Sequence, residues 1–398
     1  MVNETNIQCK IALLPGDGIG PEVLHAAVGV LKAVESRLTG VTLIFEEFSV
    51  GANEYLRGGD PLPASIFDRL RGFDAILLGA MGLPDVRWSN GIEMTPQLDL
   101  RERLDLYCGL RPIYLFHSQD CPLRDKAQGS IDLVIVREST EGLFSSRKKE
   151  LNAKADFVND QLLITRKGSE RIIRAAFKVA MRRRRHLTLV DKANVLPSMA
   201  FFRRIFNEIA PEYPEVTSEQ LYVDAVALYL VQKPEMFDVI VTENMFGDIL
   251  TDLAAGLVGG MGMAPSADIG DEYAVFQPSH GSAPDIAGRG AANPVAAILS
   301  AAMMLDWLGH SECRKGGDMI RASVQALFSD LTARTREMGG KLSTFEMADG
   351  KQGKQLTPAV EFSALNYTEM IPLLIAGMKE QQQTIEELKK EIEELKKK

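Results

Sequence analysis

Cysteine is scarce in this chain, with four residues among 398, and none of them forms a CxxC motif. This scarcity argues against a disulfide-stabilised secreted scaffold and favours a reducing, cytoplasmic location. No stretch reaches the roughly 18 uninterrupted apolar residues that cross a membrane. The first ten residues, MVNETNIQCK, lack the basic start and apolar segment of a secretory signal. We therefore expect neither a membrane segment nor a signal peptide.

Positive charge is also in deficit. The chain has 45 Lys and Arg against 54 Asp and Glu, a net charge of −9, which argues against nonspecific nucleic-acid binding. A small anionic substrate remains compatible, because a few local arginines can bind one whatever the net charge. The length suffices for two domains of roughly 100–200 residues each.

Strand-like and helix-like segments alternate along the chain. Short apolar runs typical of buried strands are CKIALLP, VTLIFEEF, FDAILLGAMG, SIDLVIVRE, LTLVDKANV and FDVIVTENM. Helical periodicity lies between most of them, as in VLHAAVGVLKAVESRL and GSERIIRAAFKVAMRRRR. This alternation predicts an α/β fold with a largely parallel sheet flanked by helices.

The last residues, 379–398, have a different pattern. Ile385, Leu388, Ile392 and Leu395 recur at alternating steps of three and four, among Glu and Lys. This is the apolar seam of a heptad repeat, and it predicts a coiled-coil-like helical tail. We interpret the tail as an appended oligomerising or spacer segment; a solvated helical extension is the alternative.

Two aspartates in TENMFGDILTDLAAGLVGG form the most informative pattern. Asp248 and Asp252 are four residues apart, so on a helix both carboxylates project from one face. The surrounding helix is apolar or glycine-rich, which makes a solvated acidic face a poor explanation. Two carboxylates with room for water and substrate oxygens suit Mg²⁺ or Mn²⁺. The pair therefore predicts a divalent-metal site.

Two glycine-rich loops are candidates for nucleotide binding. GDGIG follows a strand, but its glycine spacing and the next residue, Pro21, fit the dinucleotide fingerprint poorly, so it predicts a tight turn near a cleft. The loop PSHGSAPDIAGRGAANP offers small residues, backbone N–H groups and an imidazole. In this loop, the carboxylate of Asp285 would accept hydrogen bonds from ribose hydroxyls. The same charge would repel the extra phosphate of NADP, which favours NAD. A plain surface loop with an Asx turn is the alternative.

Arginines gather before and within the strands that precede the aspartates. Arg101 and Arg111 lie in LDLRERLDLYCGLRP, and Arg137 lies in SIDLVIVRE. Several guanidinium groups on neighbouring elements suggest a substrate with more than one carboxylate. Lys192, just past a strand in VDKANV, would act as a general base if its pKa is lowered.

Taken together, the motifs resemble a known family. GDGIGPEV, LDLYCGLRP, VDKANVLP, TENMFGDILTDLAAGLVGG and HGSAPDIAGRGAANP occur in this order across residues 11–305. The chain is similar to the β-decarboxylating dehydrogenases of the isopropylmalate and isocitrate type. The resemblance implies a two-domain α/β fold that is not a Rossmann fold. Residues 1–105 and 260–378 would form a cofactor domain, and residues 106–259 a substrate, metal and dimerisation domain.

The resemblance also implies a set of functional residues. Leu98, Arg101, Arg111 and Arg137 would bind the substrate, and Asp224, Asp248 and Asp252 would hold Mg²⁺ or Mn²⁺. Lys192 and Asp224 would complete the site of the partner in an obligate homodimer, with Lys192 taking the hydroxyl proton. NAD would be bound by His280, Gly281, Ser282, Ala283, Asp285 and Asn293. The implied reaction is oxidation of a hydroxy acid by hydride transfer, then loss of CO₂ and protonation of the enolate.

Two positions depart from the family pattern. Phe144, in RESTEGLFSS, stands where the family usually has the tyrosine that protonates the enolate, and Gln277 stands where it usually has glutamate. In this family the loop before the first arginine sets the choice of substrate, and here it reads GIEMTPQLDLR. The resemblance therefore ranks 3-isopropylmalate first as substrate, D-malate or tartrate second and isocitrate third. Phe144 keeps a second hypothesis open, that of a catalytically weak or regulatory homologue.

Overall fold

The computed structural model describes residues 7–88, 91–148 and 156–348. The strands are β1 (Ile7–Gly16), β2 (Val41–Glu47), β3 (Ala75–Ala80), β4 (Cys108–Tyr114), β5 (Asp132–Glu138), β6 (His186–Asp191), β7 (Thr217–Tyr222), β8 (Val239–Thr242), β9 (Pro265–Ile269) and β10 (Ala274–Pro278). The α-helices are α1 (Gly20–Glu35), α2 (Ala52–Gly58), α3 (Ala64–Leu70), α4 (Pro96–Arg103), α5 (Arg166–Met181), α6 (Pro197–Ile209), α7 (Val223–Gln232), α8 (Asn244–Gly256), α9 (Val295–Trp307), α10 (Ser311–Phe328) and α11 (Thr344–Ala348). The predicted heptad tail, 379–398, lies outside these ranges. Within them, no helix is long and apolar enough to cross a membrane.

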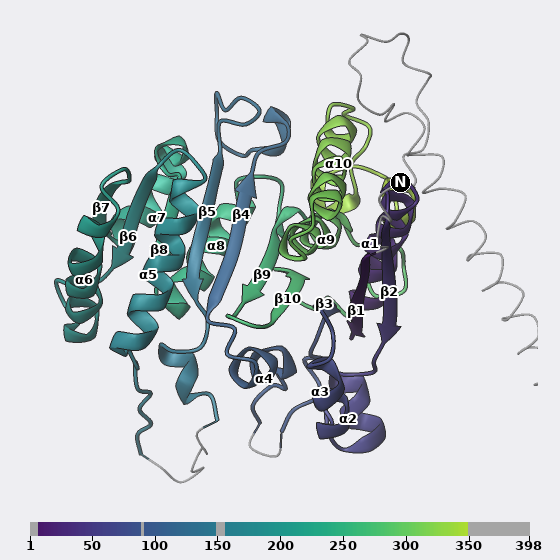
Figure 1. Cartoon of the computed structure of the whole chain (residues 1–398), viewed down its shortest axis with the longest axis horizontal. Coiled ribbons are helices and arrows are strands. Elements are labelled where there is room, and N and C mark those ends of the chain that lie inside the picture. The colour runs from purple at the N-terminus through teal and green to yellow at the C-terminus, as the bar shows by residue number, and fades with distance from the viewer. Residues whose placement is uncertain (1–6, 89–90, 149–155, 349–398) are drawn as a thin grey trace, which may run out of the picture.

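The described strands form one sheet in the order β2-β1-β3-β10-β9-β4-β5-β8-β6-β7 (Figure 1). Neighbours pair in parallel in both outer parts of this sheet. In the centre, β9 pairs antiparallel with β10 and β4, and β4 pairs antiparallel with β5. The predicted α/β class is therefore confirmed, with a central reversal of strand direction that the alternation of strands and helices did not indicate.

The sheet order keeps the strands of each predicted domain together. Strands β2, β1, β3, β10 and β9 come from 1–105 and 260–378, and they are contiguous in the sheet. Strands β4, β5, β8, β6 and β7 come from 106–259 and form the other half. The pairing of β9 with β4 joins the two halves. The division into two domains itself stays a prediction.

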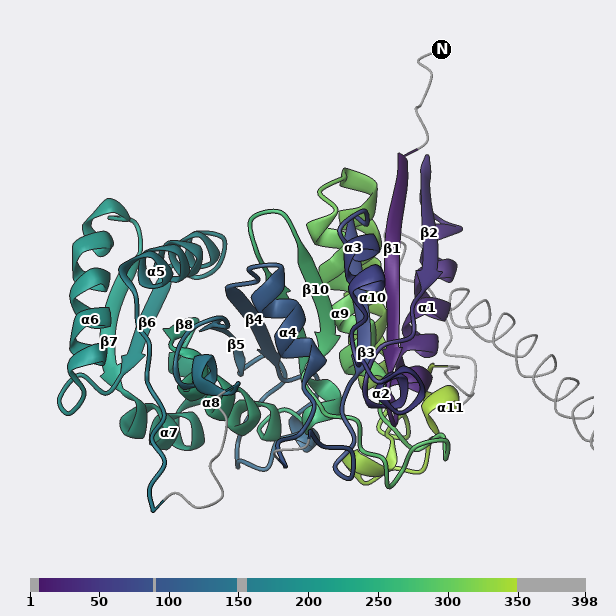
Figure 2. The same ribbon diagram turned by 90° about the horizontal axis from the view of Figure 1, so that it is seen from below.

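Alternating side chains build a core on each face of the sheet. In β1, Ile11 and Leu13 face a cluster with α1, α9 and α10, while Ala12 and Leu14 face a cluster with α3 and α4. The other half of the sheet repeats this arrangement, with α5 and α6 on one face and α7 and α8 on the other. Figure 2 shows α7 and α8 side by side below this half.

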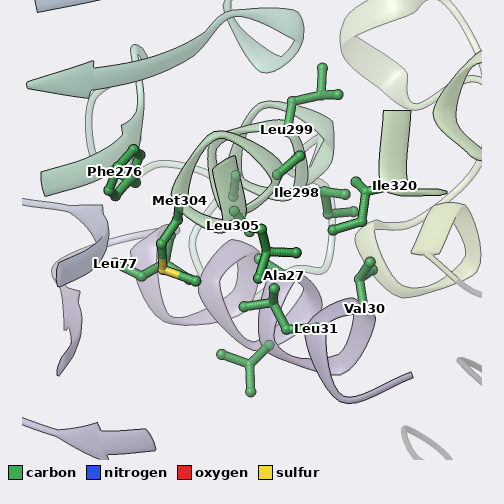
Figure 3. Packing of buried hydrophobic residues seen from close by; sticks show 14 of the residues in the cluster. Ala27, Val30, Leu31, Leu77, Phe276, Ile298, Leu299, Met304, Leu305 and Ile320 are labelled. Carbon is green, nitrogen blue, oxygen red and sulfur yellow. The ribbon is translucent and has the colours of Figure 1, made fainter. Parts of the chain in front are cut away.

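Helix α9 is the centre of the largest core cluster. Its small residues leave almost the whole helix buried between the sheet, α1 and α10. Figure 3 shows Ala27 and Leu31 of α1 next to Leu305 of α9. These contacts hold α1 and α9 together against the half of the sheet that contains β1, β3 and β10.

Leu31→Ala is expected to lower the free energy of unfolding by about 2–5 kcal/mol, because Leu31 is fully buried and its truncation leaves a cavity. Chemical denaturation followed by circular dichroism measures this change. The matched control is Lys32→Ala, since the neighbouring side chain is exposed on the same helix. Equal, small losses in both variants would show that α1 does not depend on this packing.

Candidate active site

A cavity of about 260 Å³ is lined by residues from the strands in the centre of the sheet and from α4 and α8. Arg111 of β4 and Arg137 of β5 reach it, and so do the end of β3 and the segment after β10. Eight of the predicted substrate, metal and cofactor residues line this cavity, although they come from segments far apart in sequence. They are Leu98, Arg101, Arg111, Arg137, Asp248, Asp252, His280 and Gly281. A ligand in this cavity would contact elements of both predicted domains.

Arg137 is held firmly although its side chain is almost fully buried. Its Nε and Nη2 donate to Oδ1 of Asn244 at 2.9 and 2.6 Å, and its Nη1 pairs with Asp248. Gly247 permits this packing, because a Cβ there would lie 2.7 Å from Cγ of Arg137. Burial lowers the pKa of Arg137 to about 10, which still leaves the group charged at neutral pH.

The other two arginines also have fixed partners. Nη1 of Arg111 donates to Oγ of Ser279 at 2.7 Å, and burial lowers the pKa of Arg111. In the described structure, Nε of Arg111 is buried without a hydrogen-bond partner. Nε of Arg101 donates to Asp268 at 2.9 Å. Three buried guanidinium groups thus surround one cavity, and guanidinium groups are good donors to carboxylates.

Helix α8 presents the two predicted metal ligands to the cavity. Its first turn is capped by Glu243, whose carboxylate accepts from the backbone N–H groups of Phe246 at 2.7 Å and Met245 at 3.1 Å. Burial, and then the charge of Asp248, raises the pKa of Asp252. A divalent cation would relieve this repulsion, so the oxygen donors fit Mg²⁺ or Mn²⁺. Within the described ranges, no third acidic, His or Cys side chain joins them to complete a metal cluster.

Asp224, the third predicted metal ligand, is placed elsewhere. It lies in the first turn of α7 and accepts a 2.7 Å hydrogen bond from Nζ of Lys192, which follows β6. This bond lowers the pKa of Asp224. Neither residue is among those that line the cavity of the same chain. The structure therefore groups Lys192 with Asp224, but not with Asp248 and Asp252.

The two glycine-rich loops pack against each other. The N–H of Ile19, in GDGIG, donates to the carbonyl of Ser282 at 2.7 Å, and a side chain at Gly18 would collide with the same carbonyl. GDGIG is thus a tight turn that supports the HGSAPD loop. Of that loop, His280 and Gly281 line the cavity, and burial lowers the pKa of His280.

The remaining predicted cofactor residues lie outside the cavity wall. Asp285 is exposed and Ser282 is buried. Asn293 accepts from the N–H of Val295 at 3.1 Å, at the start of α9. Ala283 has a φ of +36°, an uncommon backbone conformation for a residue with a side chain.

The sequence motifs indicate some residues of the site but not others. Phe144 is one that they indicate, and the centre of its ring lies 5.2 Å from the guanidinium of Arg137. Asn244 and Asp268 were missed, as was Ser279, which carries the only hydroxyl among the described residues that line the cavity. The sequence does contain one signal for Asp268, because an acidic residue inside the short apolar strand PSADI is unusual.

Comparisons with known proteins match most of the chain. Residues 10–350 match the family model described as isocitrate/isopropylmalate dehydrogenase. A 3-isopropylmalate dehydrogenase of Moorella thermoacetica is 49% identical over 306 residues, which are 75% of this chain and 85% of the relative. A 3-isopropylmalate dehydrogenase of Carboxydothermus hydrogenoformans is 44% identical over 327 residues, 80% of this chain and 86% of the relative.

Solved structures are similar over most of the chain. Isocitrate dehydrogenase from Methylococcus capsulatus superposes with a TM-score of 0.79 at 36% identity, covering 92% of this chain and 99% of the other. A β-decarboxylating dehydrogenase from Thermococcus kodakarensis gives a TM-score of 0.71 at 40% identity, covering 86% and 94%. The likeness thus extends well beyond the cavity.

Glu243→Ala is expected to lower the free energy of unfolding by about 0.5–2 kcal/mol, because the first turn of α8 loses its cap. Glu243→Gln retains an acceptor oxygen and is expected to lose less. Urea denaturation of the two variants and the wild type measures the difference. An equal loss in both variants would mean that charge, and not capping, is the contribution of Glu243.

Proposed function

The chain belongs to the isocitrate/isopropylmalate dehydrogenase family, and on this premise we propose that it oxidises and decarboxylates a 3-substituted malate, with 3-isopropylmalate as the first candidate. The family and the fold predicted from the motifs are confirmed. The observation that carries the proposal is the convergence of three buried arginines with Asp248 and Asp252 around one cavity. This combination binds a dicarboxylate and a divalent cation side by side.

The arginines would bind and orient the two carboxylates of the substrate. Arg111 has a buried Nε with no protein partner in the described structure, so a substrate oxygen would satisfy it. Leu98 lines the same cavity and offers apolar surface to an isopropyl group at C3. The arginines thus account for the malate core and Leu98 for the substituent.

Cofactor binding is supported by the chemistry of the side chains. Asp248 and Asp252 would hold Mg²⁺ or Mn²⁺ together with Asp224 from a second copy of the chain. When bound, the ion would polarise the oxygens of the substrate as a Lewis acid. The loop from His280 to Ala283 and Asn293 would hold NAD, the hydride acceptor. Asp285 is exposed beside this loop and would repel the extra phosphate of NADP.

A homodimer would bring Lys192 and Asp224 to the cavity of a partner subunit. Asp224 lies in the first turn of α7, and Lys192 follows β6. Neither residue lines the cavity of its own chain. Helices α7 and α8 lie side by side and expose Leu228, Val231 and Ile249. Burial of such side chains favours association through this face. Lys192 would then accept the hydroxyl proton of the substrate as hydride leaves.

The last chemical step lacks an obvious donor. After CO₂ leaves, the enolate must receive a proton, and Phe144 has no hydroxyl to supply it. Its ring instead packs under the guanidinium of Arg137. This observation supports a second candidate function, that of a catalytically weak or regulatory homologue.

Purified protein with Mn²⁺ and NAD is expected to form NADH from 3-isopropylmalate, and to do so faster than from D-malate, tartrate or isocitrate. NADP should be a poorer acceptor, and chelation with EDTA should abolish the reaction. Absorbance at the NADH band measures the rate. Higher activity with D-malate or tartrate would move the proposal to that substrate, and no activity with any of them would favour the regulatory homologue.

Arg111→Lys and Arg103→Lys form a matched pair for the same assay. Arg111 is buried at the cavity, whereas Arg103 is exposed on α4 with its guanidinium over the Phe67 ring. The Arg111 variant is expected to lose about a hundredfold in kcat/KM, or roughly 2.7 kcal/mol of transition-state stabilisation. The Arg103 variant should keep wild-type kinetics; equal losses would show that the cavity is not the substrate site.

Phe144→Tyr is expected to raise kcat by about tenfold, because it places a proton donor on the cavity wall. NADH formation and CO₂ release are measured together in the variant and the wild type. Phe157→Tyr is the control, since Phe157 is 81% exposed. Unchanged rates of both steps in the Phe144 variant would show that residue 144 does not face the reacting carbon.

A further inference from the structure

Asp268 is a fully buried carboxylate in the centre of the sheet. It lies in β9, between β10 and β4, and its side chain has no solvent exposure. One oxygen, Oδ2, accepts from Nε of Arg101 at 2.9 Å, and the other accepts from the hydroxyl of Ser139 at 3.4 Å. Asp268 does not line the cavity, so it stands behind Arg101 and not beside the substrate.

Gln277 donates to the same carboxylate oxygen. Strand β10 pairs Val275 with Asp268, so Gln277 lies diagonally across on the same face of the sheet. Its Nε2 is 2.7 Å from Oδ2 of Asp268, and its side chain lines the cavity. This bond fixes which end of the amide faces Asp268.

An acid at position 277 would be incompatible with this arrangement at neutral pH. Two carboxylates would then lie within hydrogen-bond distance in a buried region, where like charges cannot both ionise easily. This chain has an amide at this position, and its Nε2 donates to Asp268. The amide therefore matches the acid at 268.

We propose that Asp268 and Gln277 form a matched acid–amide pair that positions the guanidinium of Arg101 for a substrate carboxylate. The assignment rests on the proposed function, in which Arg101 binds the substrate. Both members are positioning residues, because Asp268 acts through Arg101 and Gln277 acts through Asp268. With Oδ2 shared between two donors, the carboxylate has little freedom to rotate, and the guanidinium direction is fixed with it.

Several charged or titratable groups face Asp268. Burial alone raises the pKa of Asp268, but neighbouring arginines lower it, and the net pKa lies below the ordinary value. The groups are Arg101 from α4, Arg111 and Cys108 from β4, and Arg137 from β5. Asp268 is therefore ionised in the wild type at all pH values at which the enzyme is assayed, and its role does not titrate there.

The decisive variant is Gln277→Glu, because a protonated glutamate imitates the amide donor and an ionised one does not. The buried acid pair shares a proton with a raised pKa, so the donor is present at low pH and lost as pH rises. We expect KM for the substrate close to the wild-type value at about pH 6 and roughly tenfold higher at about pH 8.5, with kcat changed less.

Two further variants isolate the pairing. Gln277→Met removes the donor without adding charge, so its KM should be raised to a similar degree at every pH. The double variant Asp268→Asn, Gln277→Glu exchanges acid and amide, restores a donor and an acceptor, and should lose the added pH dependence. A Gln277→Glu profile parallel to the wild type, or a double variant as impaired as Gln277→Glu, would overturn the pairing.

Failure of this inference is separable from failure of the proposed function. The wild type is assayed first, and its turnover of malates decides the function alone. Binding of malonate, a simple dicarboxylate, is then measured by titration calorimetry across the same pH range for all variants, and it tests Arg101 without turnover. Loss of affinity at high pH in Gln277→Glu alone supports the pair, and identical affinities overturn it. Thermal unfolding midpoints confirm that each variant is folded.

Discussion

The site depends on keeping three guanidinium groups charged inside the protein. Arg137, Arg111 and Arg101 are only 1%, 4% and 6% exposed, and buried charges without partners are strongly unfavourable. Each therefore has a dedicated partner. Asn244 and Asp248 hold Arg137, Ser279 holds Arg111, and Asp268 holds Arg101. These contacts fix the three arginine side chains before a ligand binds. Fixed side chains lower the entropic cost of orienting a substrate.

The reversal of strand direction makes this cluster possible. Because β9 and β4 run antiparallel to their neighbours, residues from β4, β9 and β10 approach one another on one face of the sheet centre. Helix α4 adds Arg101, and α8 adds the two aspartates. A uniformly parallel sheet would carry its functional residues mainly on loops at one edge. Here the strands themselves supply an arginine from each of β4 and β5, which explains the burial of the site.

The sequence predicted the parts of the site that have local patterns. Asp248 and Asp252 followed from helical spacing, and their place on α8 facing the arginines agrees with it. The α/β class followed from alternating periodicities. The central reversal was not predicted, because β9 and β10 are only five residues long each, and because β9 pairs with β4, a strand far away in sequence. Asp268 and Asn244 were missed for the same reason: their roles depend on contacts with residues more than 100 positions away.

Charge balance around the cavity bears on the choice of substrate. The positive charges of Arg101, Arg111 and Arg137 are matched by the carboxylates of Asp248, Asp252 and Asp268. A divalent cation and a malate dianion add equal and opposite charge, and Lys192 and Asp224 from a partner would add a cancelling pair. A tricarboxylate such as isocitrate would leave one negative charge unmatched in a buried site, where Coulomb interactions are strong. Under the proposed function, Gln277 preserves this balance because an amide on the cavity wall adds no charge.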